Sequence, residues 1–192
     1  AGLPPAAADL ILERAGGIPL YAVEVVRMLM DRGQLVPGDD GYELVEPLQQ
    51  IELPDSLRGL VAARIDGLPP DDRALLLSAS VLGHRFRTDA LAAISGLTPE
   101  DLRSGLVGLA RRELLAVSTE PTPLGDDVAF VEDLVREVAY RTLSRHERRS
   151  LHLAATEYLV AVNEEELVEA IGGHLLAAHR ADADAPDADA VA

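Results

Sequence analysis

The chain has 192 residues, of which 48% are hydrophobic and only 3% aromatic, and its formal charge is −16 at pH 7. All 17 basic residues are arginine, and lysine and cysteine are absent. Without lysine, the sequence contains no GxxxxGK[ST] phosphate-binding loop and no Schiff-base lysine. Without cysteine, it has no disulfide, cysteine zinc site or thiol nucleophile. A surface of this charge repels nucleic acid and anionic membranes, so binding to either is disfavoured.

Targeting signals are also missing from the sequence. No apolar run reaches the roughly 18 residues of a membrane span, and no signal-peptide pattern begins the chain. The sequence therefore predicts a cytoplasmic protein with an aliphatic core. The first residue is Ala rather than Met, so we expect the chain to be part of a longer protein.

Two helices separated by a break are predicted for residues 1–33. The break is Gly16-Gly17-Ile18-Pro19, and the second helix covers Leu20 to Asp31. A short two-stranded hairpin follows within residues 35–45, on either side of a PGDDG turn. Residues 46–52 lead to the next helix.

The stretch from Leu53 to Gly83 predicts two helices that begin at prolines. In the first, Pro54 marks the start, Asp55 is a first-turn acid and Gly67 is expected to end the helix in the left-handed conformation. The second helix begins at Pro69-Pro70 and is apolar on all sides. We therefore expect it to be the most buried helix of the chain.

Residues 84–143 continue with a pattern typical of a winged helix. A loop over 84–86 and a short helix over 89–94 come first, and Thr98 caps a helix that runs to about Arg112. Two strands, Leu114 to Val117 and 128–130, are predicted around a polar loop. Three helices followed by a two-stranded hairpin form the winged-helix arrangement.

The pattern beyond the hairpin is helical. One helix is predicted around Leu134 to Leu143, a capping box of Ser144 and Glu147 opens a second, and a third begins near Glu164. The last two form a pair over 144–180 that fits the start of a helical repeat, although one pair does not establish a repeat. From residue 181 the tail has too little large apolar surface to fold.

Residues with catalytic or metal-binding chemistry do not form a known constellation. The five histidines lack the i, i+4 spacing of a helical zinc pair, and no GxSxG nucleophile elbow occurs. Val128 to Asp133 resembles an apolar strand that ends in magnesium-binding acids. Because no phosphate loop accompanies it, a plain strand-to-helix junction is the favoured interpretation.

Arginines are concentrated in one part of the sequence, together with two histidines: Arg136, Arg141, Arg145, His146, Arg148, Arg149 and His152. A solvated helix face that pairs with the surplus acids explains them best, and an anion site for a nucleotide phosphate or a neighbouring domain is the alternative. The predicted recognition helix, Pro99 to Arg112, carries three arginines but also two acids, and has no stripe of Asn, Gln or Lys. The winged helix is therefore favoured as a packing module over a DNA reader.

Four segments together resemble the signal-transducing (STAND) branch of the AAA-type ATPases. Glu13 to Leu20, ERAGGIPL, is similar to the family's RAGGNPL segment, and Leu53 to Gly83 is similar to its LPDSLRxLLxARLDxLPxxxRxLLxxASVLG segment. Leu109 to Val117 resembles LxxRxLL, and Phe130 to Leu143 resembles FxHxLIREVAYxxL. The resemblance covers roughly residues 10–160, and the combination is far more specific than any one motif.

The resemblance implies a mainly α fold. Residues 1–52 would be the end of a helical lid of the ATPase module with a short hairpin, and 53–143 a winged-helix-like domain. Residues 144–180 would be an antiparallel helix pair that starts TPR-like repeats, and 181–192 a disordered tail. The phosphate loop and the magnesium-binding strand would lie upstream of this chain.

The resemblance also implies which residues face a nucleotide. In related STAND proteins the Gly-x-Pro turn contacts the base side, which here means Gly17, Pro19 and Leu20, and a winged-helix His senses the phosphates. Glu132 stands where the family pattern has that His, and a carboxylate repels phosphate unless a metal ion or Arg intervenes. Ile18 replaces the usual Asn, which is a milder departure.

These observations predict a non-catalytic regulatory fragment that needs no cofactor of its own. The longer protein would bind ATP or ADP with Mg²⁺, and this chain would relay the nucleotide state to an output domain, either a class III adenylate or guanylate cyclase or a LuxR-type transcription regulator. Its partners would be the upstream nucleotide-binding domain, the output domain and proteins bound by the C-terminal helices. The alternatives are a winged-helix DNA-binding regulator and an interaction scaffold without nucleotide dependence.

Overall fold

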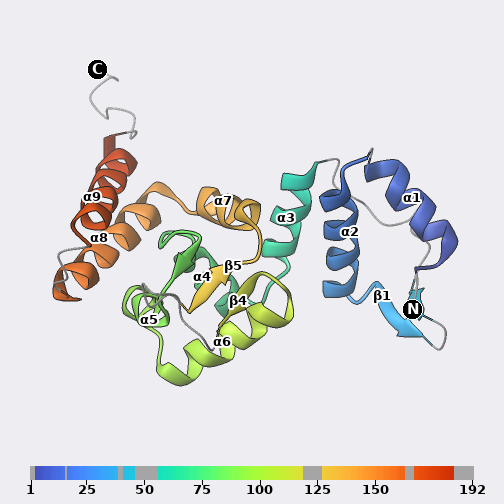
Figure 1. Ribbon diagram of the computed structural model, residues 1–192, viewed down its shortest axis with the longest axis horizontal. Coiled ribbons are helices and arrows are strands. Elements are labelled where there is room, and N and C mark those ends of the chain that lie inside the picture. Colours follow the sequence, from blue (N-terminus) through green and yellow to red (C-terminus); the bar gives the residue numbers. More distant parts are fainter. Residues whose placement is uncertain are drawn as a thin grey trace, which may run out of the picture. The chain divides into compact units, whose positions relative to one another are not determined.

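The computed structural model describes residues 3–15, 17–38, 41–45, 56–118, 127–162 and 167–183. The fold is mainly helical, as expected, with two small antiparallel sheets (Figure 1). The chain divides into two compact units, Ala1–Pro69 and Pro70–Ala192, and each is described by itself. Within the described ranges, no helix is long and apolar enough to cross a membrane.

The first unit confirms the predicted helices and hairpin. Its elements are α1 (Pro5–Ala15), α2 (Pro19–Asp31), the hairpin strands β1 (Leu35–Gly38) and β2 (Gly41–Leu44), and α3 (Leu57–Asp66). Their apolar faces close around one aliphatic core, made of Ile11, Ala15, Tyr21, Val25, Met28, Leu29, Leu35 and Leu60. The predicted linker 46–52 lies outside the described residues.

The ends of α3 differ from the prediction. Ser56 is the N-cap, and its hydroxyl accepts a hydrogen bond from the Gly59 N–H at 3.1 Å, so the helix begins after Pro54 and Asp55, which lie outside the described residues. Gly67 has φ −79° and ψ −3°, which is right-handed rather than left-handed. The helix ends here because Leu68 precedes a proline, and a residue before proline is disfavoured in the helical conformation.

The partner of α3 sets the unit boundary. Leu60 of α3 is fully buried in the core that α1 and α2 form, and α3 packs along α2. The first unit therefore extends to Pro69, whereas the sequence analysis placed 53–143 together in one winged-helix-like domain. An apolar stripe shows that a helix must be covered, but it does not show which neighbour covers it.

The second unit contains six helices and three strands among its described residues. In chain order they are α4 (Pro70–Ala79), β3 (Arg85–Phe86), α5 (Thr88–Ser95), α6 (Pro99–Arg111), β4 (Leu115–Val117), β5 (Val128–Phe130), α7 (Asp133–Thr142), α8 (Arg145–Val162) and α9 (Val168–Ala183). The strands form one antiparallel sheet in the order β3-β5-β4. Residues 84–86 were expected to be a loop, but Arg85 and Phe86 pair with Ala129 and Val128 and so form a strand.

Helix α4 lies at the centre of the second unit, as predicted. Leu75, Leu76, Leu77 and Ala79 are all buried, and the helix packs against α5, α6 and α7. Its contact with α6 is close at Gly105, where a Cβ would come within 2.5 Å of the Leu75 Cδ2 atom. Arg112, at the end of α6, adds a hydrogen bond of 3.3 Å to the Asp72 carboxylate on α4.

The connection between β4 and β5 is fastened at both ends. The Ser118 N–H donates to the Asp127 carbonyl oxygen at 2.7 Å. The Asp127 carboxylate accepts bonds from the Thr88 N–H at 2.7 Å and the Thr88 hydroxyl at 2.6 Å, at the start of α5. Residues 119–126 lie outside the described residues.

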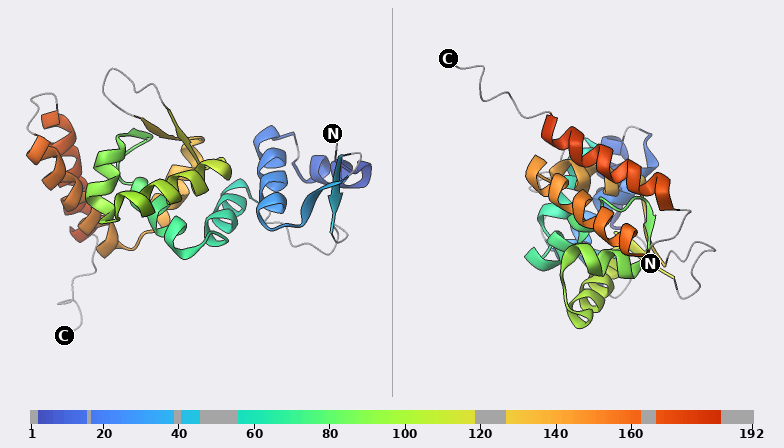
Figure 2. Two further views of the ribbon diagram at one scale, coloured as in Figure 1. Left: turned by 90° about the horizontal axis from the view of Figure 1, so that it is seen from below. Right: turned by 90° about the vertical axis from the view of Figure 1, so that its left-hand side faces the viewer.

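The C-terminal helices form a closely packed pair, α8 in orange and α9 in red in Figure 2. The predicted capping box is present, because the Ser144 N–H donates to Glu147 Oε2 at 2.8 Å and the Glu147 N–H donates to the Ser144 hydroxyl at 3.2 Å. Helix α9 begins at Val168 rather than near Glu164 and continues to Ala183. The predicted frayed tail is therefore helical over 181–183, and 184–192 lies outside the described residues.

Candidate functional site

The predicted base-facing turn is an exposed N-terminal corner of α2. Gly17 has φ +82°, which only glycine adopts without strain, and no atom of the described chain lies within 4 Å of the position of a Cβ there. Pro19 is in the first turn of α2, and Ile18, the N-cap, is 54% exposed and has no side chain capable of capping. The geometry of the turn thus depends on Gly17 and Pro19, and both residues are on the surface.

Backbone hydrogen bonds hold this turn in place. The Ile18 N–H donates to the Ala15 carbonyl at 2.8 Å, and the Tyr21 N–H donates to the Ile18 carbonyl at 3.1 Å. Tyr21 itself is buried in the first-unit core, while Leu20 is half-buried beside the turn. The turn therefore has a rigid base and an exposed outer edge, which is the arrangement needed to hold a backbone edge against a ligand.

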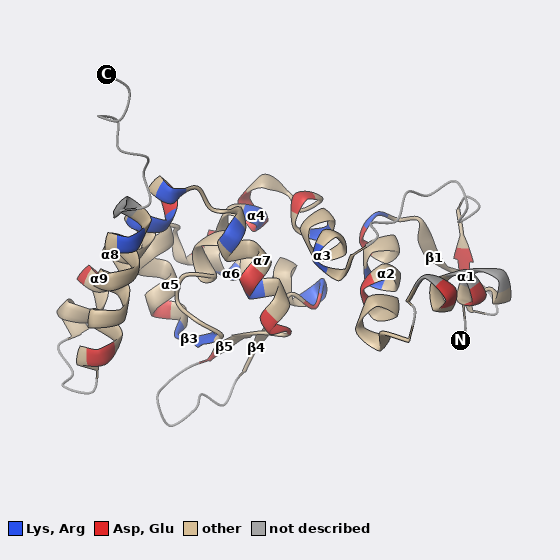
Figure 3. Ribbon diagram, turned by 90° about the horizontal axis from the view of Figure 1, so that it is seen from above, with Lys and Arg blue, Asp and Glu red and all other residues tan. Residues whose placement is uncertain are grey.

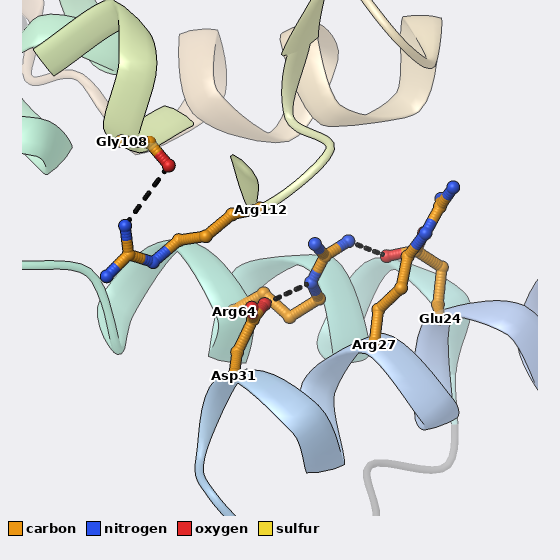
Figure 4. A network of polar contacts seen from close by, with 6 residues as sticks. All are labelled: Glu24, Arg27, Asp31, Arg64, Gly108 and Arg112. Carbon is orange, nitrogen blue, oxygen red and sulfur yellow. Dashed lines mark hydrogen bonds and ion pairs between the residues drawn. The ribbon is translucent and has the colours of Figure 1, made fainter. Parts of the chain in front are cut away.

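Helix α2 is joined to α3 by a buried ion network (Figure 4). The Arg64 guanidinium on α3 donates to Glu24 Oε2 at 2.6 Å and to Asp31 Oδ2 at 3.0 Å, both on α2. Arg27 donates to the other Glu24 oxygen at 2.8 Å. The side chains of Glu24 and Arg64 are each only 1% exposed, so this pair lies within the unit rather than on its surface.

The network is balanced, with two carboxylates and two guanidinium groups. Removing a charge from water is costly, and a buried pair recovers that cost only when its geometry is good and its other donors and acceptors are satisfied. Here Arg64 donates to both Glu24 and Asp31 on α2, and both carboxylate oxygens of Glu24 accept hydrogen bonds. The network therefore fixes the register of α3 along α2.

The sequence analysis did not identify Glu24, Asp31 or Arg64 as functional. A signal was present, because Glu24 lies on the apolar face of its helix next to Val25 and Met28. Arg64 likewise follows Leu60 and Val61 and precedes Ile65, all of which are buried. A charged residue on the apolar stripe of each of two helices predicts a buried pair.

Glu132 lies in the second unit, so the structure describes it separately from the Gly17 turn. It is the N-cap residue of α7, half-buried, with no capping bond from its side chain, and its carbonyl accepts a bond from the Val135 N–H at 3.1 Å. The next residue, Asp133, places Oδ1 2.9 Å from the His84 Nδ1 atom, without the angle of a hydrogen bond. A carboxylate, an imidazole and the start of a helix thus meet at this position.

Helix α6, the predicted recognition helix, borders a groove of about 670 Å³ within the second unit. Arg87 and Arg103 line it, but so do Asp89 and Asp127, and the Arg87 guanidinium lowers the pKa of the Asp89 carboxyl from its ordinary value. Figure 3 shows the same intermixing of acidic and basic segments around α5 and α6. Such a surface lacks the continuous positive charge that binds a nucleic-acid backbone.

The arginines that cluster in the sequence between residues 136 and 149 lie in different environments in the structure. Arg141 pairs with Glu137 on the exposed side of α7, as expected for a solvated helix face. Arg145 and Arg148, by contrast, line a pocket together with Arg180 of α9. In the described part of the chain, no group of three or more His, Asp and Glu side chains is arranged to hold a metal ion.

In comparisons with known proteins, no protein-family model matches the chain, and no curated protein matches it.

Proposed function

We propose that this chain is a non-catalytic regulatory part of a multidomain, ATP-dependent signalling protein of the STAND type. The observation that carries the proposal is the buried Glu24–Arg64 pair. It joins α2, whose first residues end the Glu13 to Leu20 segment, to α3, which lies within the Leu53 to Gly83 segment. The connection gives the turn a route to influence the rest of the chain.

The route runs along two helices and a short linker. A shift of the turn moves α2, because Pro19 and Leu20 are its first residues, and the ion network carries the shift to α3. Three residues, Gly67 to Pro69, then separate α3 from α4, the buried centre of the second unit. Regulation by this route requires that ATP and ADP make different contacts at the turn, since a ligand shifts an equilibrium only through its differential affinity.

The finer architecture fits the same proposal. The order helix, strand, helix, helix, strand, strand over α4 to β5, with the sheet order β3-β5-β4, supports a winged-helix interpretation. We infer that the second unit begins with a winged-helix domain and that α8 and α9 are the start of TPR-like repeats. In this role Gly17, Pro19, Leu20 and Glu132 face a nucleotide and Mg²⁺ bound by an upstream domain, and the protein acts in the cytoplasm.

The output domain is a nucleotidyl cyclase or a transcription regulator, and this chain performs no chemistry itself. The first alternative, a DNA-binding winged helix, is disfavoured by the acids in the groove beside α6 and by the charge of −16. The second alternative is a scaffold whose binding is independent of nucleotide. It predicts that changes at the GGIPL turn leave signalling unaffected.

The decisive experiment substitutes Pro19 in the longer protein. Pro19→Ala frees φ at this position and relaxes Ile18, so the turn loses its fixed distance from the base. We expect weaker binding of ATP and ADP, measured with a fluorescent nucleotide, and a shifted basal output. Pro99→Ala is the matched control, because Pro99 occupies the same first-turn position in α6. Unchanged nucleotide affinity and unchanged signalling in Pro19→Ala would remove the turn from the nucleotide site.

The chain alone supplies a second arm of this experiment. Because it has no lysine and no phosphate loop, we expect no micromolar binding of Mg-ATP by calorimetry. The same expectation holds for duplex DNA in a low-salt gel shift. Micromolar affinity for ATP would show that this chain contains a nucleotide site of its own, and micromolar affinity for DNA would favour the DNA-binding regulator.

A further inference from the structure

Half of the residues that line a small pocket in the second unit are arginines. Its lining residues are Tyr140 of α7, Arg145 and Arg148 of α8, and Arg180 with Ala177 and Ala181 of α9, around a volume of about 170 Å³. None of these residues is acidic, although acids outnumber arginines 33 to 17 in the chain as a whole. Three arginines therefore line one cavity in a protein of strongly negative charge.

The capping box at the start of α8 sets the positions of two of them. It begins the helix at Arg145, so that Arg145 and Arg148 are one turn apart and project from the same side. The box also engages Glu147, whose pKa is lowered from its ordinary value first by hydrogen bonding with the Ser144 side chain and then by the bond that its carboxylate accepts from the Ser144 N–H. Figure 3 shows the basic segments gathered at this end of α8.

Arg148 is held in place by two further contacts. Its Nε–H donates to the Leu143 carbonyl at 3.1 Å, and its guanidinium carbon lies 5.4 Å from the centre of the Tyr140 ring. The second contact is within the range of a cation–π interaction. Among the described residues, neither Arg148 nor Arg180 forms an ion pair with a carboxylate, whereas Arg145 already has an interaction partner.

Tyr140 is also held by a chain of two histidines, of which His152 is buried and His174 half-buried. Its hydroxyl lies 2.9 Å from Nε2 of His152, whose Nδ1 is 2.8 Å from Nδ1 of His174. Burial, the neighbouring His174 and then Arg148 lower the pKa of His152 to about 4. His152 is therefore neutral near pH 7, and the positive charge of the pocket comes from arginine alone.

We propose that this pocket binds a phosphoryl group, either as free phosphate or as the phosphate of a small soluble monoester. Arginine presents planar pairs of N–H donors that match phosphate oxygens, and the guanidinium groups of Arg148 and Arg180 together offer more donors than one carboxylate accepts. A cavity of about 170 Å³ is large enough to hold a phosphate group.

Binding would join α8 to α9. Arg145 and Arg148 come from one helix and Arg180 from the other, so one anion shared among them links the ends of the pair. A ligand that binds only the folded state also stabilises that state by mass action. The site is independent of the proposed nucleotide-relay function, because it uses residues of the second unit that the relay does not require.

The test uses the full 192-residue chain and inorganic phosphate as the probe, with ionic strength held constant by sodium chloride. We expect saturable shifts of the His152 and His174 imidazole NMR signals and a higher melting temperature for α8 and α9. Arg180→Gln and Arg148→Gln should each weaken phosphate binding at least tenfold, whereas Arg149→Gln, which removes the same charge from the same helix but does not line the pocket, should change it less than about twofold.

Acetate and glycerol phosphate complete the experiment. Equal effects of acetate and phosphate would overturn the assignment to a phosphoryl group, and equal losses in all three arginine variants would reduce the effect to general charge. No saturation at phosphate concentrations up to about 50 mM at constant ionic strength would overturn the site itself. Tighter binding of glycerol phosphate identifies the ligand as a monoester, and tighter binding of inorganic phosphate identifies it as the free anion.

Discussion

Arg64 is a buried charged residue of the first unit, so its substitution should show how much the ion network contributes to the free energy of unfolding. Arg64→Met leaves Glu24 with only Arg27 as a counter-ion, and losing one partner of a buried pair typically costs about 3–5 kcal/mol. We expect a loss of about 3 kcal/mol, seen by urea unfolding and as faster amide exchange in α2 and α3. The double variant Glu24→Gln, Arg64→Met should recover part of it.

Arg58→Met is the matched control, since Arg58 is an exposed arginine on the same helix. Its effect should stay within about 0.5 kcal/mol. If Arg64→Met destabilised the chain no more than this control, the network would hold α3 no better than surface charges do.

His152 predicts a dependence of stability on pH. Its pKa is lowered to about 4 in the folded chain, so between about pH 4 and 6.5 the unfolded state binds more protons, and stability falls as pH falls. The pKa of His174 is lowered by burial as well, and two protonated rings would face each other with N–H groups. We expect a loss of about 1–2 kcal/mol between pH 7 and pH 5 from this pair.

The comparison with His152→Gln isolates this contribution from the many carboxylates of the chain. Glutamine keeps a polar group near Tyr140 but does not titrate, so the variant should lose less stability on acidification than the unmodified chain. An NMR titration of the ring provides a direct reading. A His152 signal that titrates near pH 6.5, or equal pH slopes in both proteins, would contradict the assignment.

Gly105 of α6 and Gly172 of α9 differ in how closely they are packed, so replacing each with alanine should have opposite effects on stability. A Cβ on Gly105 would lie 2.5 Å from the side chain of Leu75, which is buried. A Cβ on Gly172 in α9 would meet no neighbouring side chain within 4 Å. Gly105→Ala should therefore destabilise the chain by about 1–2 kcal/mol, because the packed core must shift. Gly172→Ala should stabilise it by up to about 1 kcal/mol. Urea unfolding measures both, and equal stabilisation would show that α4 and α6 are loosely packed.

The elements that sequence reasoning predicted correctly depend on near neighbours. Thr98 and Ser144 cap their helices through residues three positions away, and both caps are present as expected. Strand β3 was missed because two residues have no period of their own, and only pairing with β5, much later in the chain, makes them a strand. The Arg180 side of the phosphate pocket was missed for the same reason, since α9 brings it to α8 only through tertiary packing.

At the scale of the molecule, the division at Pro69 predicts that the two units lose structure separately. Leu76→Asp puts an unpaired charge into the buried centre of the second unit and should abolish amide protection in α4 to α7. Helices α2 and α3 should keep their amide protection. If residues 53–143 unfolded as one cooperative domain, α3 would lose its protection as well. Leu176→Asp is the control, because Leu176 is 48% exposed on α9. Loss of protection in both units would mean that they unfold as one, and an unchanged melting temperature would make α4 peripheral.

The fastening of β4 to β5 has a consequence for how such a chain tolerates change over generations. Ser118, Asp127 and Thr88 secure both ends of the connection through hydrogen bonds among themselves. Extra residues inserted between Ser118 and Asp127 would leave these hydrogen bonds intact, and doubling the length of a connection costs only about 0.6 kcal/mol in closure entropy. The segment is thus a place where insertions can accumulate almost neutrally, and where a lineage could acquire a new binding epitope while the supporting sheet remains unaltered.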